Sequence, residues 1–427
     1  MRILFVSGEY PPMQGGVGDY THCLGQALVR LGADVHVLTR PPAGRDGARA
    51  AAASDEPVVH GMMRGAGWGL WRHVLQLAGE LQPDVIHIQY QSAAYDLHPA
   101  VNFLPWRLRA SRRIAEQRSS PAPAGRRGRQ RPAILTTFHD LREPYMFPKA
   151  GPLRWQAVLA MARQSDAAVV TNPEDWALLA RDAPQLAPRM WPIPIGSNID
   201  GRPPAGYERA GRRAAWDAGP DDWLLAYFGF LNRNKGGEAL IRALDALVAA
   251  GRPARLIMVG GQTGSSDPTN VAYLSEIKAL IEALKLAGRV AWTGFTPDEE
   301  VSANLLAADC AVLPYCQGAS LRHGSLMAAL AHGLPIVTTF NPAAKDEAAK
   351  ARFARLDDGI SASLVRPNDP RGLAEAVTSL MTNTGLRCKL AAGARDLARQ
   401  FEWDTIAQQH MEAYRAACQY GAEWPRP

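Results

Sequence analysis

Long apolar runs are missing from this chain. None of its 427 residues lies in a stretch that approaches the roughly 18 consecutive apolar residues needed to span a bilayer. The apolar run that follows Met1 and Arg2 is too short for the core of a signal peptide, and no small-residue cleavage site comes after it. We therefore expect a cytoplasmic protein without a membrane-spanning helix.

Cysteine is scarce as well. The chain has five cysteines and no Cys-x-x-Cys pair, so disulfides and a structural zinc site are not expected. Cys310 and Cys316 flank the end of one predicted strand without a third ligand nearby. Acidic pairs occur at 221–222 and 357–358, but both fall in predicted loops. The sequence therefore predicts no metal site.

Positive charge is concentrated in one segment. The net charge is +6, yet residues 106–131 alone hold nine arginines and one acid, Glu116, and carry +8. The centre of this segment is rich in Pro, Ala, Gly and Ser and lacks apolar periodicity, which is typical of a loop. It is either a solvated tether or a patch for anionic lipid or an anionic acceptor. Nucleic acid is not expected, because no aromatic residues alternate with the arginines.

Short apolar runs alternate with amphipathic segments along the whole chain. This alternation predicts parallel sheets with helices on both faces, and the length predicts two or three domains. The predicted strands are residues 2–7, 34–39, 84–88, 133–138, 166–170, 223–228, 255–259, 289–293, 309–313, 335–339 and 362–365.

The alternation breaks once, over residues 193–213, where Gly, Pro and charged residues accumulate. We interpret this stretch as a linker between two doubly wound α/β domains of nearly equal size. In such sheets ligands bind beyond the carboxyl ends of the strands. With two domains, the cleft between them is the expected site.

Two glycine-containing loops follow predicted strands. In the first, Gly15, Gly16 and Gly18 open a helix whose amides and dipole favour an anion. In the second, after residues 223–228, Lys235 stands at a glycine-flanked helix start and suits a phosphate, with Arg233 close enough to assist. Either loop could instead be a plain tight turn or a surface charge pair.

Glycines at two further strand ends are candidates for nucleotide contact. Gly229 directly follows the strand predicted before Lys235. Gly294 ends the strand predicted over 289–293, where a base could lie against the backbone.

The segment from Pro314 to Thr339 contains no carboxylate. Its loop holds Ser320, Arg322 and His323, and Gly324 and Ser325 begin a helix of small residues. An anion can reach the amides of such a helix start. Together with a lysine from a neighbouring loop, Arg322 and this helix would form a cradle for a diphosphate.

His139 and Asp140 directly follow a predicted strand of the first half. Histidine is the usual proton carrier near neutral pH. We expect His139 to take part in catalysis, although a histidine here can also be a hydrogen-bonding anchor.

Taken together, these stretches resemble the GT-B-fold glycosyltransferases, specifically the large retaining family 4 (group 1). The similarity covers nearly the whole chain in the family's order. It is carried by YPPMQGGVGDY near the start, HD at 139–140, IPIGSNI at 193–199, KG at 235–236, GLPIV at 333–337, LVRPNDPRGLAEAV at 364–377 and FEWDTIAQQHMEAY at 401–414.

The resemblance implies two Rossmann-like domains facing across a cleft. An acceptor-side domain would span 1–195, a donor-binding domain 196–400, and a C-terminal helix over 401–427 would cross back to the first domain. Lys235 matches the phosphate lysine of the family, and His139 matches the histidine near the transferred sugar. Catalysis would use His139, Lys235 and Arg322.

Two departures from the family pattern stand out. The family's two glutamates, separated by seven residues, are Ser320 and Ala328 here, and its arginine five residues before the lysine is Phe230. Contacts to the donor sugar and the ribose would therefore have to be rebuilt. We expect Arg322 to replace the charge absent at Phe230.

The implied function is metal-independent transfer of a hexose-type sugar from a nucleotide sugar, UDP-linked rather than GDP-linked. No cofactor is needed beyond this co-substrate. The acceptor could be a saccharide, a lipid-linked molecule or a small molecule, and the arginine segment could contact the inner face of an anionic membrane. Two alternatives stay open: a sugar-nucleotide epimerase on the same fold, and a non-catalytic sugar-nucleotide-binding subunit.

Overall fold

The computed structural model describes residues 1–13, 15–41, 55–118, 131–141, 151–199, 201–261, 268–341 and 351–423. The chain divides into two compact units. Unit 1 comprises Met1–Ile195, Ala351–Phe353 and Trp403–Pro427, and unit 2 comprises Gly196–Lys350 and Ala354–Glu402. The centre of the arginine segment, 119–130, lies outside the described residues.

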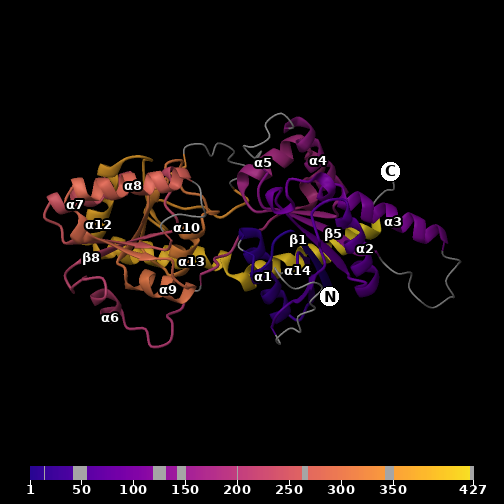
Figure 1. Cartoon of the computed structure of the whole chain (residues 1–427), viewed down its shortest axis with the longest axis horizontal. Coiled ribbons are helices and arrows are strands. Elements are labelled where there is room, and N and C mark those ends of the chain that lie inside the picture. Colours follow the sequence, from indigo (N-terminus) through magenta and orange to yellow (C-terminus); the bar gives the residue numbers. More distant parts are fainter. Residues whose placement is uncertain are drawn as a thin grey trace. The chain divides into compact units, whose positions relative to one another are not determined.

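Unit 1 is built on a seven-stranded parallel sheet with the strand order β3-β2-β1-β4-β5-β6-β7 (Figure 1). The strands are β1 (Arg2–Ser7), β2 (Asp34–Thr39), β3 (Val58–Gly61), β4 (Val85–Tyr90), β5 (Ala133–Phe138), β6 (Ala167–Val170) and β7 (Met190–Pro192). The helices are α1 (Gly16–Arg30), α2 (Gly69–Leu81), α3 (Leu104–Arg118), α4 (Gly151–Gln164), α5 (Pro173–Asp182) and α14 (Trp403–Glu423).

Unit 2 has a six-stranded parallel sheet with the order β10-β9-β8-β11-β12-β13. The strands are β8 (Trp223–Phe228), β9 (Ala254–Val259), β10 (Val290–Gly294), β11 (Cys310–Leu313), β12 (Ile336–Thr339) and β13 (Ser363–Val365). The helices are α6 (Arg209–Ala214), α7 (Gly237–Ala249), α8 (Pro268–Ala283), α9 (Asp298–Ala307), α10 (Gly324–Ala331), α12 (Pro370–Thr382) and α13 (Thr384–Ala398).

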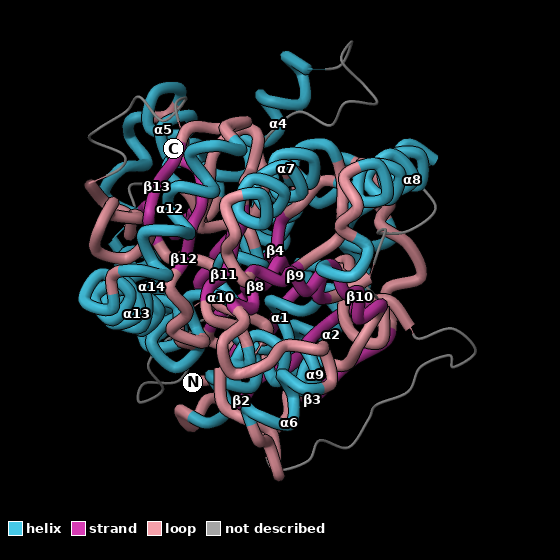
Figure 2. The backbone as a smooth tube through the Cα atoms, turned by 90° about the vertical axis from the view of Figure 1, so that its left-hand side faces the viewer, coloured by secondary structure: helices cyan, strands magenta, loops and turns pink. Residues whose placement is uncertain are grey.

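Both sheets are covered on their two faces, so the central strands are apolar throughout. Every residue of β4 and of β5 is buried. In unit 2, α7 and α8 lie on one side of β8, β9 and β10, and α9 lies on the other (Figure 2). The predicted fold class, two doubly wound α/β domains, is confirmed. The predicted linker over 193–213 is wrong in its last part, because Arg209–Ala214 form α6.

Helix α14 completes the core of unit 1 although it comes from the far end of the chain. It contacts α1 and β5 (Figure 1). Tyr414 is fully buried in the same apolar cluster as Phe5 and Leu24. The amphipathic face of α1 is therefore buried by a partner almost 400 residues away in the sequence.

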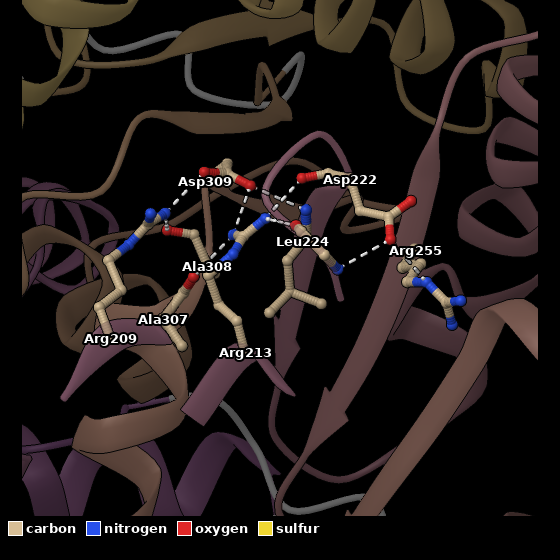
Figure 3. A network of polar contacts seen from close by, with 9 residues as sticks. Arg209, Arg213, Asp222, Leu224, Arg255, Ala307, Ala308 and Asp309 are labelled. Atoms are coloured by element: carbon tan, nitrogen blue, oxygen red, sulfur yellow. Dashed lines mark hydrogen bonds and ion pairs between the residues drawn. The ribbon is translucent and has the colours of Figure 1, made fainter. Parts of the chain in front are cut away.

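A buried polar network ties α6 to the sheet of unit 2 (Figure 3). Arg213 is 6% exposed, and its guanidinium lies 2.8 Å from a carboxylate oxygen of Asp309. The same guanidinium donates to the carbonyl oxygens of Ala307, Gly219 and Asp222. Because Asp309 also accepts from the amide of Leu224 at the second position of β8, this ion pair fixes the amino-terminal edge of the sheet.

Candidate functional site

Each sheet has one point where the order of strands reverses. In unit 2 the first strand, β8, lies between β9 and β11, and in unit 1 the first strand, β1, lies between β2 and β4. The chain leaves the two central strands in opposite directions there, which opens a crevice at their carboxyl ends. The loops after these strands are where binding residues are expected.

In unit 2 the loops after β8 and β11 are in direct contact. Gly236 has a φ of 71°, and a Cβ atom there would lie 1.9 Å from the carbonyl oxygen of Pro314. Only glycine fits, since the position demands both the left-handed backbone and the close approach. The amide of Cys316 donates to the carbonyl oxygen of Asn234 at 2.9 Å. These contacts place Lys235 beside the end of β11.

Tyr315 is the centre of this site, and sequence reasoning did not identify it. The Nζ atom of Lys235 lies 4.8 Å from the centroid of its ring, and the ring of His323 stacks on it with centroids 3.9 Å apart. Its hydroxyl lies 2.7 Å from that of Ser325. One tyrosine thus joins the lysine of one loop to the start of α10. The sequence could have indicated Tyr315 through its position in the Leu-Pro-Tyr turn that follows a predicted strand.

The charge of Lys235 is held in a partly desolvated position. Burial lowers the pKa of its ammonium group below the usual range, because a low-dielectric environment disfavours the charged form. The tyrosine ring compensates in part through its negative face. A partly desolvated ammonium group at a sheet crevice is suited to an anionic ligand, which would restore the lost solvation.

The start of α10 presents several polar groups close together. His323 precedes the helix with an extended backbone, φ −77° and ψ 110°, and its Nδ1 accepts from the amide of Ser320 at 3.2 Å. The amide of Arg322 donates to the Ser320 hydroxyl at 3.4 Å. A Cβ atom at Gly324 would meet nothing within 4 Å, so the first turn is open to a ligand.

Gly229 lies beside the start of α10, whereas the side chain of Arg233 is engaged elsewhere. A Cβ atom at Gly229 would lie 3.7 Å from that of Ser325. The guanidinium of Arg233 forms an ion pair with Glu276 at 2.6 Å, on the exposed side of the loop. Gly294 ends β10, which β9 separates from β8.

The two positions of the absent glutamates differ in their surroundings. Ala328 is fully buried in α10, whereas Ser320 is half-buried and lies in the loop before the helix. Phe230, at the position of the absent arginine, is 47% exposed. Its ring lies against Gly261, where a Cβ atom would be 2.6 Å from it.

In unit 1 the glycine loop begins α1 as predicted, but a carboxylate of the chain itself lies there. A Cβ atom at Gly15 would lie 2.0 Å from the Oε2 atom of Glu9. Burial raises the pKa of Glu9, while Arg40 and the amides of Gly18 and Val17 act to lower it. Sequence reasoning missed Glu9. A Cβ atom at Gly16 would meet nothing within 4 Å.

His139 lies at the end of β5, next to a buried polar cluster in unit 1. It is 6% exposed, its Nε2 lies 2.9 Å from the Oε1 of Gln89, and its ring meets that of Tyr20 edge-on at 4.6 Å. His87 and His410 are fully buried nearby. His139 is therefore well anchored in unit 1.

Two arginines of the basic segment serve the fold. The guanidinium groups of Arg109 and Arg131 lie 2.7 and 3.0 Å from the same oxygen of Asp166, a residue that is almost fully buried. The other Asp166 oxygen accepts from the amide of Ile134. These two charges hold β5 and β6 together rather than facing an anionic partner.

Across the described ranges, no three His, Cys, Asp or Glu side chains gather as metal ligands would. None of the helices in those ranges is long and apolar enough to cross a membrane.

Comparison with known proteins identifies the family. The sequence profile of "Glycosyl transferases group 1" matches residues 223–383, and that of "Glycosyltransferase Family 4" matches residues 14–109. The two profiles therefore match parts of unit 2 and of unit 1. The chain is a group 1 glycosyltransferase.

Relatives of this glycosyltransferase include the glycogen synthase of Mycobacterium tuberculosis, which is 28% identical over 100% of this chain and 97% of its own length. Among solved structures, sucrose-phosphate synthase from Thermosynechococcus elongatus superimposes with a TM-score of 0.65 at 21% identity, covering 97% of this chain and 98% of its own. HepE from Anabaena, solved in complex with UDP, superimposes with a TM-score of 0.66 at 19% identity, covering 96% of this chain and 99% of its own. These structures have the GT-B fold, as does the group 1 glycosyltransferase described here.

Proposed function

We propose that this glycosyltransferase moves a hexose from a UDP-sugar to a saccharide acceptor, with retention of configuration and without a metal ion. The observation that carries the donor side is the position of Lys235, half-buried against Tyr315 next to the start of α10. A UDP-linked donor is favoured over a GDP-linked one because HepE, a protein of the same fold, was solved with UDP. Retention follows from the resemblance to retaining enzymes.

In this proposal the leaving diphosphate lies over the first turn of α10. Lys235 and Arg322 supply positive charge, and the amides of Gly324 and Ser325 donate hydrogen bonds to the phosphate oxygens. Electrostatic stabilisation of this kind acts strongly in a water-poor site. His139 of unit 1 is proposed to take part in catalysis by holding or moving a proton.

The experiment is a titration of UDP and GDP into the wild-type protein and Lys235→Ala. A charge-assisted contact is worth roughly 1.5–3 kcal/mol, so we expect UDP affinity to fall by about one to two decades. Lys278→Ala is the matched control, because Lys278 also lies over an aromatic ring of unit 2, that of Trp292 at 5.9 Å. Equal UDP affinity in wild type and Lys235→Ala would remove Lys235 from the site.

Product analysis distinguishes the two alternatives. An epimerase would convert a UDP-sugar without any acceptor, and a binding subunit would bind UDP but neither transfer the sugar nor hydrolyse the donor. A transferase releases UDP faster when an acceptor is present.

We also propose that the arginine segment contacts an anionic surface. Each Lys or Arg near such a surface is worth about 1 kcal/mol, which salt screens. Deleting 119–130 should weaken binding to phosphatidylserine vesicles at low salt and leave donor hydrolysis intact. If the intact protein does not bind such vesicles, the segment is only a tether.

A further inference from the structure

Two central strands of unit 1 carry fully buried polar side chains on one face. His87 and Gln89 alternate along β4 and therefore point to the same face of the sheet, and Thr137 of β5 lies opposite Gln89 in the strand register. His139 continues this row, since its amide donates to the carbonyl oxygen of Tyr90 just beyond the end of β5. Polar groups buried in this way must satisfy one another with hydrogen bonds.

The directions of these hydrogen bonds are set from α14. The carbonyl oxygen of Ile406 can only accept, so the hydrogen of His410 is on Nδ1, 2.8 Å away. Burial lowers the pKa of His410 to about 4, so its ring is neutral at pH 7 and Nε2 accepts from the hydroxyl of Tyr20 at 3.2 Å. Because the hydrogen of Tyr20 is used there, Thr137 must be the donor in the hydrogen bond that these two hydroxyls share.

The same reasoning fixes the ring of His87. The hydrogen of Thr137 points to Tyr20, so the Thr137 oxygen accepts from Nε2 of His87 at 2.7 Å. Nδ1 of His87 then accepts from the hydroxyl of Tyr414 at 2.8 Å. Each hydrogen in this series has one acceptor, and a satisfied buried network of this kind is rigid.

Gln89 and Tyr20 connect the network to His139. The Nε2 atom of Gln89 lies 3.5 Å from both ring nitrogens of His87, and the amide oxygen lies on the other side, 2.9 Å from Nε2 of His139. The ring of Tyr20 meets that of His139 edge-on. An amide oxygen can only accept, so Nε2 of His139 carries the hydrogen, and in the neutral ring the lone pair is on Nδ1.

We propose that Gln89 is a positioning residue that holds His139 in the tautomer with its hydrogen on Nε2, so that Nδ1 is the nitrogen that takes up a proton. Tyr20 holds the plane of the ring, and Tyr20 is itself fixed by α14 through His410. The C-terminal helix therefore helps to orient His139. The inference rests on the proposed catalytic role of His139 and adds the residues that orient it.

The first experiment measures the tautomer directly. The whole chain, labelled with ¹⁵N-histidine, is studied by long-range ¹H–¹⁵N NMR at about pH 8, where a histidine with the ordinary pKa of about 6.5 is neutral. The signals of His139 are those that disappear in His139→Ala. We expect its hydrogen on Nε2, and a hydrogen on Nδ1 in the wild type would overturn the inference.

The second experiment compares two substitutions of Gln89 by UDP release from UDP-glucose. Gln89→Leu is similar in size but has no acceptor, so both tautomers of His139 should be populated and kcat should fall about tenfold. KM for UDP-glucose should stay within about twofold, because the residues proposed to hold UDP belong to unit 2. Gln89→Glu keeps an acceptor oxygen, so it should keep the hydrogen on Nε2 and recover most of kcat.

Gln89→Glu should also move the pH dependence of kcat. A carboxylate beside Nε2 favours the charged ring and should raise the pKa of His139 by about one unit or more, so the change of kcat that reports this ring should shift to higher pH. A merely structural role of Gln89 would not produce this shift. The other titratable groups around His139 are unchanged in the variant, and they include Tyr20, His87, His410, Asp140 and Asp175.

Gln76→Leu is the matched control, because Gln76 donates to Glu80 on the exposed side of α2. It should change neither kcat nor the tautomer. A wild-type kcat in Gln89→Leu, or an equal loss of kcat in Gln89→Leu and Gln89→Glu, would overturn the inference. A normal kcat in His139→Ala would instead overturn the catalytic role of His139, and the NMR result would still decide whether Gln89 orients the ring, so the two failures are distinguishable.

Discussion

The Nζ atom of Lys235 lies 4.8 Å from the centre of the Tyr315 ring, and the hydroxyl of that ring lies 2.7 Å from the hydroxyl of Ser325. Tyr315 is 2% exposed, so its own ring and hydroxyl are held out of solvent. The ring and the hydroxyl can be removed separately, which makes their contributions measurable.

We expect Tyr315→Phe to retain UDP binding within about threefold and Tyr315→Leu to weaken it by roughly tenfold. The phenylalanine ring keeps the cation–π contact with Lys235, which is worth about 0.5–2 kcal/mol, whereas leucine loses it. Isothermal titration with UDP measures both variants. If Tyr315→Leu binds UDP as wild type does, the ring does not position the lysine.

Arg322 should act through its planar guanidinium. Arg322→Ala is expected to lower kcat more than Arg322→Lys, because lysine keeps the charge but cannot form two parallel hydrogen bonds to a phosphate. Turnover with UDP-glucose and a saccharide acceptor provides the comparison. Equal rates in both variants and in the wild type would exclude Arg322 from the diphosphate cradle.

His139→Ala should reduce kcat while UDP affinity changes little. His139 belongs to unit 1, whereas the residues proposed to hold UDP belong to unit 2. Thermal unfolding of the variant must be followed as well, because the contact with Gln89 at 2.9 Å is also lost. A variant with normal kcat would reduce His139 to a structural residue.

The stability of unit 1 should decrease below about pH 6.5. Nδ1 of His410 lies 2.8 Å from the carbonyl oxygen of Ile406, and that oxygen can only accept. The neutral ring therefore donates from Nδ1, and Nε2 accepts from the hydroxyl of Tyr20. Burial lowers the pKa of His410 to about 4, and burial together with His410 and His139 lowers the pKa of His87.

The unfolded chain takes up protons at these histidines near pH 6.5, while the folded chain keeps His410 neutral down to about pH 4. The free energy of unfolding therefore falls by about 1.4 kcal/mol per pH unit per group as the pH decreases through this window. Urea unfolding between pH 7.5 and 4.5 measures the slope. His410→Gln should reduce this slope by the contribution of one titrating group, and an unchanged slope would contradict the prediction.

The ion pair between Arg213 and Asp309 should dominate the electrostatic stability of unit 2. Arg213→Met removes the buried cation of Asp309 together with its hydrogen bonds to three carbonyl oxygens, and leaves only the more exposed Arg209 beside that carboxylate (Figure 3), which is expected to cost about 3–5 kcal/mol. Arg242→Met, which removes an exposed helical pair with Glu238, should cost less than about 1 kcal/mol. Denaturant midpoints of the two variants test this difference, and equal midpoints would contradict it.

Local sequence was sufficient for the central strands and for the start of each binding loop. β1, β2, β5 and β8 have the bounds that their apolar runs predict, because strands buried on both faces must be apolar throughout. Two strands were missed. β3 has only four residues and β7 only three, ending in Pro192, and edge strands this short carry too weak a pattern to be recognised.

The sequence by itself determined the doubly wound class, the family and the position of Lys235 at a glycine-flanked helix start, since each depends on short local patterns and on their order along the chain. Only the tertiary structure decided what surrounds them. Tyr315 reaches Lys235 because β11 lies beside β8, and Glu9 fills the start of α1 because its loop turns back onto Gly15. Contacts between segments far apart in sequence follow from strand order and side-chain packing, and no local pattern encodes them.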